Sequence, residues 1–302
     1  MRIDAYSSLT AHGFHRVAYT DWGDRANPHV VICVHGLTRN ARDFDFLAET
    51  LSSDCRVVCP DIVGRGASDW LPHKKDYGYP LYLTDMAALI ARVGTKPVRS
   101  RWDALWRRLR GRRDEPRIDW VGTSMGALIG MMLAAQPQSP IQRLVINDAG
   151  PFVPRAALQR IAAYVGKDPR FGAVDELEQY LRKFCASFGP LTDTQWRHLA
   201  THSSRQGKDG SYGFSYDPGI AEPFRGSLFY DVDLWPLWDK IRCPVLILRG
   251  ADSDLLLHKT AQEMLTRGPR TRLVEFAGVG HAPMLMAQDQ IDAVREFLLG
   301  DD

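Results

Sequence analysis

The sequence predicts an α/β fold in which an open, mostly parallel sheet is flanked by helices. Three observations lead to this prediction. Short β-branched runs recur along the chain, and each ends at a glycine, proline, asparagine or aspartate. Several of these runs are apolar at nearly every position, which is typical of strands buried on both faces of a parallel sheet. Helical stretches alternate with the runs, as they do in α/β sheets.

The expected elements follow one another in a regular order along the chain. The strands are expected at residues 30–34, 56–59, 118–121, 141–146, 244–248 and 273–276. The helices are expected at residues 43–51, 83–93, 125–135, 260–265 and 288–299. In sheets of this kind the ligand binds beyond the carboxyl ends of the strands, so functional residues are expected where the strands end.

Residues 150–235 interrupt the alternation of strands and helices. Helical segments are expected around residues 158–165, 177–188 and 195–202, followed by a Gly- and Tyr-rich loop at 206–219. We expect a helical cap over the carboxyl edge of the sheet, which divides the chain into a core (1–149 and 236–302) and a cap (150–235). Aromatic residues gather at the end of the cap, either to pack it or to form an apolar wall for a substrate: Tyr212, Phe214, Tyr216, Phe224, Phe229 and Tyr230.

Composition and charge exclude several classes of protein. The net charge of +2 gives no reason to expect a nucleic-acid partner. The five cysteines are odd in number and form no CxxC pair, which disfavours a zinc ribbon or a disulfide framework. The N-terminus lacks the apolar stretch of a signal peptide, and no run approaches the ~18 apolar residues of a membrane span. We therefore expect a soluble, cytoplasmic protein.

The segment 96–117 differs from the rest of the core because it carries nine basic and three acidic residues, a local charge of +6. Trp102, Leu105, Trp106 and Leu109 fall on one face of a helix. This basic amphipathic insertion could dock on the core, lie on an anionic membrane surface, or bind another protein or a nucleic acid.

The strongest catalytic signal is the G-x-S-x-G string Gly122-Thr123-Ser124-Met125-Gly126, which lies between an expected strand and an expected helix. The string alone is a weak signal, but this context is that of a nucleophile held on a sharp strand-to-helix turn. Ser124 is therefore predicted to be the nucleophile. The alternative is a glycine-rich turn with a helix-capping serine.

A serine nucleophile needs a base, and the base needs an orienting acid. His281 follows the last expected strand in a loop of small residues, and the Ser…Asp…His chain order predicts a late histidine. Three aspartates follow earlier strands and could be the acid: Asp148, Asp252 and Asp254. Spacing alone does not choose between Asp252 and Asp254.

The oxyanion of the reaction needs backbone N–H donors. Met125 follows the nucleophile, and Leu37 lies in the loop after the strand at 30–34, so their N–H groups are predicted to form the oxyanion hole. His35 in the same loop is expected to be structural and to bond nearby backbone. Asp61 and Arg65 are likewise expected to support a neighbouring loop.

These motifs occur in an order that resembles the α/β-hydrolase superfamily over nearly the whole chain. They are His35-Gly36, the loop 61–69, the Ser124 turn, the loop 249–256 and Gly280-His281. The strings 34–40 with 43–45, 119–126 and 147–152 are similar to a bacterial esterase subgroup, some members of which hydrolyse aliphatic polyesters such as polylactate. The segment 96–117 looks like an insertion relative to that subgroup.

The resemblance implies an α/β-hydrolase fold and a serine carboxylic-ester hydrolase that uses an acyl-enzyme and no metal or organic cofactor. It also favours Asp254 as the acid, because the matching aspartate in similar sequences stands in a Ser-Asp-x-Leu string. The same triad could act on a thioester, an amide or a C–C bond, so these substrates remain alternatives, as does a non-catalytic binding protein. His198 and His202 have a spacing that can hold a metal, but packing is expected because no third ligand is evident.

Overall fold

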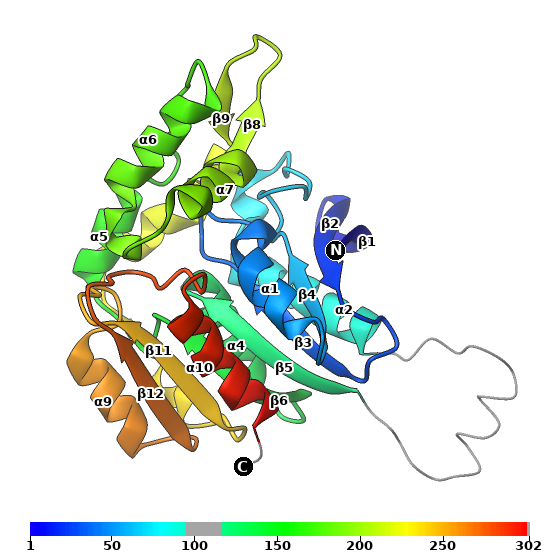
Figure 1. Cartoon of the computed structure of the whole chain (residues 1–302), viewed down its shortest axis with the longest axis vertical. Coiled ribbons are helices and arrows are strands. Elements are labelled where there is room, and N and C mark those ends of the chain that lie inside the picture. The colour runs from blue at the N-terminus through cyan, green and yellow to red at the C-terminus, as the bar shows by residue number, and fades with distance from the viewer. Residues whose placement is uncertain (95–115, 301–302) are drawn as a thin grey trace, which may run out of the picture.

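The computed structural model describes residues 1–94 and 116–300, without the side chains of 224–229. Its centre is an eight-stranded sheet in the order β1-β2-β4-β3-β5-β6-β11-β12 (Figure 1). Strands β3 to β12 of this sheet run parallel, and β2 pairs antiparallel with both β1 and β4. The predicted mostly parallel α/β sheet is therefore confirmed. The strands are β1 Arg2–Thr10, β2 Gly13–Trp22, β3 His29–Val34, β4 Arg56–Pro60, β5 Arg117–Thr123, β6 Ile141–Asn147, β11 Val245–Gly250 and β12 Thr271–Phe276.

The central strands are buried on both faces, as their continuous apolar runs predicted. In β3, Val30, Ile32 and Val34 belong to one hydrophobic cluster, whereas Val31 and Cys33 belong to another. Because successive side chains of a strand point to opposite faces, the two clusters are the two sides of the sheet.

Helices cover both sides of the sheet (Figure 1). α1 (Asp45–Leu51) and α10 (Gln288–Leu299) contribute apolar side chains to one cluster. α2 (Tyr79–Val93), α4 (Met125–Ala134) and α9 (His258–Thr266) contribute to the other. No helix among the described residues is long and apolar enough to cross a membrane.

Much of the chain between β6 and β11 lies above one end of the sheet (Figure 1). The predicted helices are present, but this region also contains two short antiparallel pairs, β7–β10 and β8–β9, which the sequence did not predict. Strands of two or three residues are too short to produce a recognisable alternation. The elements are β7 Phe152–Val153, α5 Arg155–Ala162, α6 Val174–Phe184, η3 Ala186–Phe188, α7 Asp193–Ser203, β8 Ser204–Gln206, β9 Tyr212–Phe214, η4 Pro218–Phe229, β10 Val232–Asp233 and α8 Trp235–Trp238.

The β7–β10 pair joins the two ends of this region, because Val153 pairs with Val232. The division into a core and a cap at residues 150–235 remains a prediction. The helix predicted on Trp102, Leu105, Trp106 and Leu109, and any membrane or protein contact through it, lies outside the described residues. All five cysteines are free.

Candidate active site

Ser124 lies at the junction of β5 and α4 with a backbone φ of 52° and ψ of −113°. A non-glycine residue in such a conformation costs about 1–3 kcal/mol, which the surrounding structure must offset. The flanking glycines make the turn possible: a Cβ on Gly122 would collide with the backbone of Gly126, and one on Gly126 would collide with the Val34 carbonyl. The turn projects Ser124 beyond the carboxyl end of β5, as the G-x-S-x-G string predicted.

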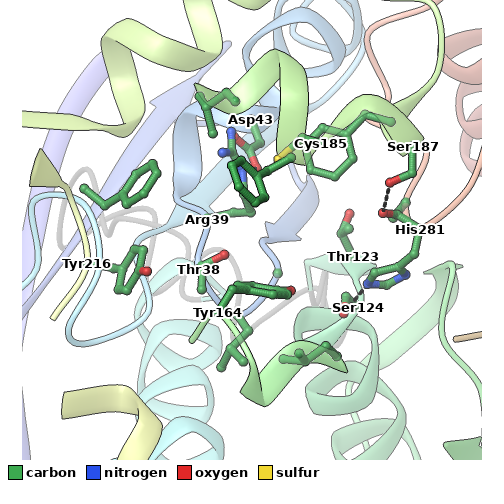
Figure 2. Close-up of a pocket in the computed structure, with 18 of the residues that line it drawn as sticks. Thr38, Arg39, Asp43, Thr123, Ser124, Tyr164, Cys185, Ser187, Tyr216 and His281 are labelled. Carbon is green, nitrogen blue, oxygen red and sulfur yellow. Dashed lines mark hydrogen bonds and ion pairs between the residues drawn. The ribbon is translucent and has the colours of Figure 1, made fainter. Parts of the chain in front are cut away.

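His281 lies in the loop after β12, and its two ring nitrogens face two different side chains. Nε2 lies 3.0 Å from Ser124 Oγ, and Nδ1 lies 2.7 Å from Asp148 Oδ2. The cap supports this loop, since Gly280 N–H donates to the Ser187 carbonyl at 2.7 Å. Ser187 Oγ in turn donates to the His281 carbonyl at 3.3 Å (Figure 2). The structure thus brings together Ser124 and His281, two of the three side chains predicted for the triad.

The third predicted member, Asp254, does not reach His281, so that assignment is wrong. Asp254 lies in the loop after β11 and forms an ion pair with Arg160 of α5, with 2.8 Å between Asp254 Oδ1 and Arg160 Nη2. The Asp254 side chain is 53% exposed, whereas the Asp148 side chain is fully buried beside His281. Asp252, the other candidate in that loop, is exposed.

The loop after β11 supplies hydrogen-bond donors to Asp148. Because β6 and β11 are neighbours in the sheet, Asp148 at the end of β6 lies beside this loop. Gly250 N–H donates to Asp148 Oδ1 at 3.1 Å, and Ser253 Oγ donates to Oδ2 at 2.6 Å. The sequence signal for Asp148 was its place directly after a buried strand, a signal that the Ser-Asp-x-Leu string outweighed.

Leu37 and Met125, predicted as oxyanion donors, flank the serine. Gly36 lies against Ser124, since a Cβ on Gly36 would be 3.7 Å from the Ser124 Cβ. Among hydrogen bonds between described residues, none is donated by the backbone N–H of Leu37 or of Met125. Met125 begins α4, where the N–H groups have no partner within the helix. Both donors are therefore available to a bound oxygen.

His35 orients the peptide group that carries the Leu37 N–H. Its Nδ1 donates to the Gly36 carbonyl at 2.7 Å, and its Nε2 accepts from Ile62 N–H at 3.0 Å. Because the C=O and N–H of a trans peptide point in opposite directions, holding the Gly36 carbonyl fixes the direction of the Leu37 N–H. Burial lowers the pKa of His35 to about 3, so this histidine is neutral and structural, as expected.

Two further residues support the neighbouring loops, as the sequence predicted. Asp61 accepts from the N–H groups of Ala41 and Ala67, each at 2.8 Å. Burial raises the pKa of Asp61 to about 6, although both hydrogen bonds oppose the shift. Arg65 Nε donates to the Leu37 carbonyl at 2.9 Å and thereby fixes the next peptide of the loop after β3.

A cavity of about 170 Å³ opens above Ser124 and His281, where residues 160–216 meet the loops after β3, β5 and β12 (Figure 2). Its wall is mainly apolar and aromatic, and most of the aromatic side chains come from the cap. They are Tyr164, Tyr180, Phe184, Phe188, Phe214 and Tyr216. Tyr212 and Tyr230 do not line it, and the side chains of Phe224 and Phe229 lie outside the described residues. Of the aromatics named from the sequence, Phe214 and Tyr216 therefore belong to the apolar wall, Tyr212 packs against a neighbouring hydrophobic cluster, and Tyr230 is 79% exposed.

The predicted pair His198 and His202 lies near Asp45, and one ligand atom from each of these three residues falls within 4.8 Å of the others. The Arg42 guanidinium already occupies this position. Its Nε donates to Asp45 Oδ2 at 2.7 Å, and its Nη1 lies 3.3 Å from His202 Nδ1. Burial, followed by the Arg42 charge, lowers the pKa of His202 to about 4. The cluster is a hydrogen-bonded contact between α7 and the core.

The chain is similar in sequence and in fold to known hydrolases. Residues 31–294 match the alpha/beta hydrolase family. The 3-hydroxybutyrate-oligomer hydrolase of Cupriavidus necator is 43% identical over 307 residues, which cover 99% of this chain and 98% of that protein. N-formylmaleamate deformylase of Pseudomonas putida is 25% identical over 288 residues, which cover 92% of this chain and 90% of that protein. The crystal structure of an alpha/beta hydrolase from Novosphingobium aromaticivorans is 35% identical and superimposes with a TM-score of 0.81 over 98% of each chain.

The chain therefore belongs to the alpha/beta hydrolase family, and the family inferred from the ordered motifs is confirmed. It is a hydrolase. The predicted likeness to bacterial enzymes that degrade polyesters is confirmed as well, since the relative from Cupriavidus necator is named for hydrolysis of 3-hydroxybutyrate oligomers.

Proposed function

We propose that this protein is a serine carboxylic-ester hydrolase that cleaves short aliphatic polyester oligomers of the 3-hydroxybutyrate type. The observation that carries the proposal is the continuous chain of contacts from Asp148 through His281 to Ser124, at the base of an apolar cavity. The 43% identity to a 3-hydroxybutyrate-oligomer hydrolase along the whole chain supports the choice of substrate.

In the proposed mechanism, Ser124 Oγ attacks the ester carbonyl while His281 Nε2 accepts its proton. Asp148, buried and held by three hydrogen bonds, keeps His281 in the tautomer with a proton on Nδ1 and stabilises the charged ring. The N–H groups of Leu37 and Met125 donate to the oxyanion of the tetrahedral intermediate. One such donor typically contributes about 10²–10³-fold in turnover.

Collapse of the intermediate breaks the acyl C–O bond, and His281 gives the proton to the departing alcohol. Water then attacks the acyl-enzyme by the same route, with His281 again acting as base, and releases the acid. Each step uses only residues of this chain and water.

Hydrolysis of p-nitrophenyl esters from acetate to palmitate, and of the 3-hydroxybutyrate dimer and trimer, tests the proposal with wild type and Ser124→Ala side by side. We expect wild type to release 3-hydroxybutyrate and Ser124→Ala to lose at least ~10³-fold in rate. A wild type that is folded but inactive on every ester would refute the proposal. Polylactate emulsions would test longer polyesters.

Amide hydrolysis is a second candidate, because the relative from Pseudomonas putida is named as a deformylase. The same nucleophile, base and oxyanion donors serve amides, and only the cavity distinguishes the substrates. Faster release of formate from an N-formyl amide than of 3-hydroxybutyrate from its dimer would favour this candidate over the ester.

A further inference from the structure

The charged side chains that line the cavity do not balance. Arg39, Arg160 and Lys167 are cationic, whereas Asp43 is the acid in the lining. Arg39 is paired with Asp43, with 2.7 Å between Arg39 Nη2 and Asp43 Oδ1. Arg160 is paired with an acid that lies outside the lining, Asp254. Lys167 has no acidic partner in the part of the chain that the structure describes, and it leaves the cavity with one uncompensated positive charge.

The backbone of Lys167 is held in place although its side chain is exposed. Its N–H donates to the Tyr164 carbonyl at 3.2 Å, and its carbonyl accepts from Tyr216 Oη at 3.1 Å. Gly166 precedes it with a φ of 86°, a conformation that favours glycine, and a Cβ there would lie 2.7 Å from the Ala221 Cβ. The backbone after α5 is therefore held in place, and it carries the exposed Lys167 side chain.

Lys167 belongs to the end of the cavity that lies away from the nucleophile. Figure 2 shows Tyr216 on one side of the cavity and Ser124 with His281 on the other, with Tyr164 and Thr38 between them. The hydrogen bond between Tyr216 Oη and the Lys167 carbonyl places Lys167 with Tyr216. A ligand that reaches from Ser124 toward Lys167 passes along the apolar wall.

We propose that Lys167 binds the free carboxylate of a short ester oligomer whose scissile carbonyl lies at Ser124. This inference rests on the proposed function. In a hydroxy-acid oligomer the free carboxylate belongs to the unit whose hydroxyl is esterified, so Lys167 holds the leaving half. Attack of Ser124 breaks the acyl C–O bond, and that half leaves as a hydroxy acid with the proton that His281 took from Ser124. One water then releases the acyl half from Ser124. The enzyme therefore removes units from the carboxyl end.

The test compares two substrates that differ only at this carboxylate: the 3-hydroxybutyrate dimer as free acid, and the same dimer capped as its neutral N-methylamide. The readout is the ratio of kcat/KM for the acid to kcat/KM for the capped dimer. We expect this ratio to exceed one in wild type, to fall about fivefold in Lys167→Met, and to fall further in Lys167→Glu. Fivefold is the upper end for an exposed ion pair. Lys167→Arg should retain most of the preference.

Lys208→Met is the matched control, because it removes the same charge from an exposed position of the cap that does not line the cavity. It should keep the wild-type ratio. Added salt should lower the wild-type ratio toward that of Lys167→Met, since exposed charges are screened.

The two proposals fail in different ways. If wild type cleaves both dimers and the ratio is the same in wild type, Lys167→Met and Lys167→Glu, the carboxylate site is refuted and ester hydrolysis stands. If folded wild type cleaves neither dimer, the proposed function fails and the inference that rests on it falls too.

Discussion

The loop after β6 and the loop after β11 end side by side at the same edge of the sheet, yet their aspartates do different things. Asp148, after β6, is fully buried and contacts His281, whereas Asp254, after β11, is 53% exposed and pairs with the cap. The loop after β11 contributes Gly250 N–H and Ser253 Oγ, which hold Asp148. Position in the sheet, and not the local string around an aspartate, decides which acid reaches the histidine.

The largest effect that this comparison predicts follows from replacing each acid in turn. Asp148→Asn should lower kcat by about 10³–10⁴-fold, because an amide no longer holds His281 in the required tautomer. Asp254→Asn and Asp252→Asn serve as matched controls. Steady-state hydrolysis of p-nitrophenyl acetate measures all three, and an Asp254→Asn variant that loses more than Asp148→Asn would reverse the comparison.

The loop after β3, a third loop at this edge of the sheet, contains His35, whose contribution to the free energy of unfolding should depend on pH. The pKa of His35 is about 3 in the folded state and that of an unfolded histidine is about 6.5, so the unfolded chain binds more protons in this window. The His35 contribution is therefore fully present above pH ~6.5 and is lost as pH falls toward 3, by about 1.4 kcal/mol per pH unit. At pH 4.5 the loss reaches roughly 3 kcal/mol.

The measurement is urea unfolding of wild type and His35→Gln between pH 7 and 4.5. The difference between their free energies of unfolding should change with pH at this slope. Taking the difference removes the contribution of Asp61, which is present in both proteins and whose raised pKa acts in the opposite direction. Replacement of the exposed His73 by Gln should leave the wild-type slope. A pH-independent difference for His35→Gln would mean that this histidine is not kept neutral by burial.

A smaller effect is expected for Ser253, the residue of the loop after β11 whose hydroxyl donates to Asp148. Ser253→Ala removes a hydroxyl that donates to Asp148 at 2.6 Å, so kcat should fall roughly tenfold, the size expected for a hydrogen bond to a charged group. KM should change little, because Ser253 does not line the cavity. A large rise in KM with an unchanged kcat would argue for a role in substrate binding instead.

The smallest effect belongs to the ion pair between Arg160 and Asp254. Both side chains are about half exposed, and such pairs contribute about 0–1 kcal/mol. Asp254→Asn should therefore change kcat by less than about threefold and the free energy of unfolding by no more than about 1 kcal/mol. The change should shrink in high salt. A stability loss of several kcal/mol, measured by urea unfolding, would show that the pair fixes the cap.

The strands whose side chains are buried on both faces of the sheet gave the clearest sequence signal. The run at 30–34 is apolar throughout because its side chains enter two hydrophobic clusters, and it became β3. The β1–β2 hairpin was missed because it lies at the edge of the sheet, where exposed and buried positions mix: Ile3 is 64% exposed and Phe14 is 79% exposed. Edge strands of this kind carry no continuous apolar run.

The residues of the candidate site were predictable where their role requires a recognisable local sequence. Ser124 and His281 were found because a strained strand-to-helix turn and a late histidine after the last strand leave local signals. Asp148 was among the candidates, but its place depends on β6 lying beside β11, a long-range pairing that no local string records. Lys167 had no signal, because its importance rests on the absence of an acidic partner in the folded cavity.

The most direct test of the central claim is the NMR signal of the proton on His281 Nδ1. A proton that is hydrogen-bonded to a buried carboxylate resonates far downfield and exchanges slowly enough to be seen. We expect this resonance in wild type and in Asp254→Asn, and its loss or a large upfield shift in Asp148→Asn. A resonance that persists in Asp148→Asn and disappears in Asp254→Asn would contradict the account.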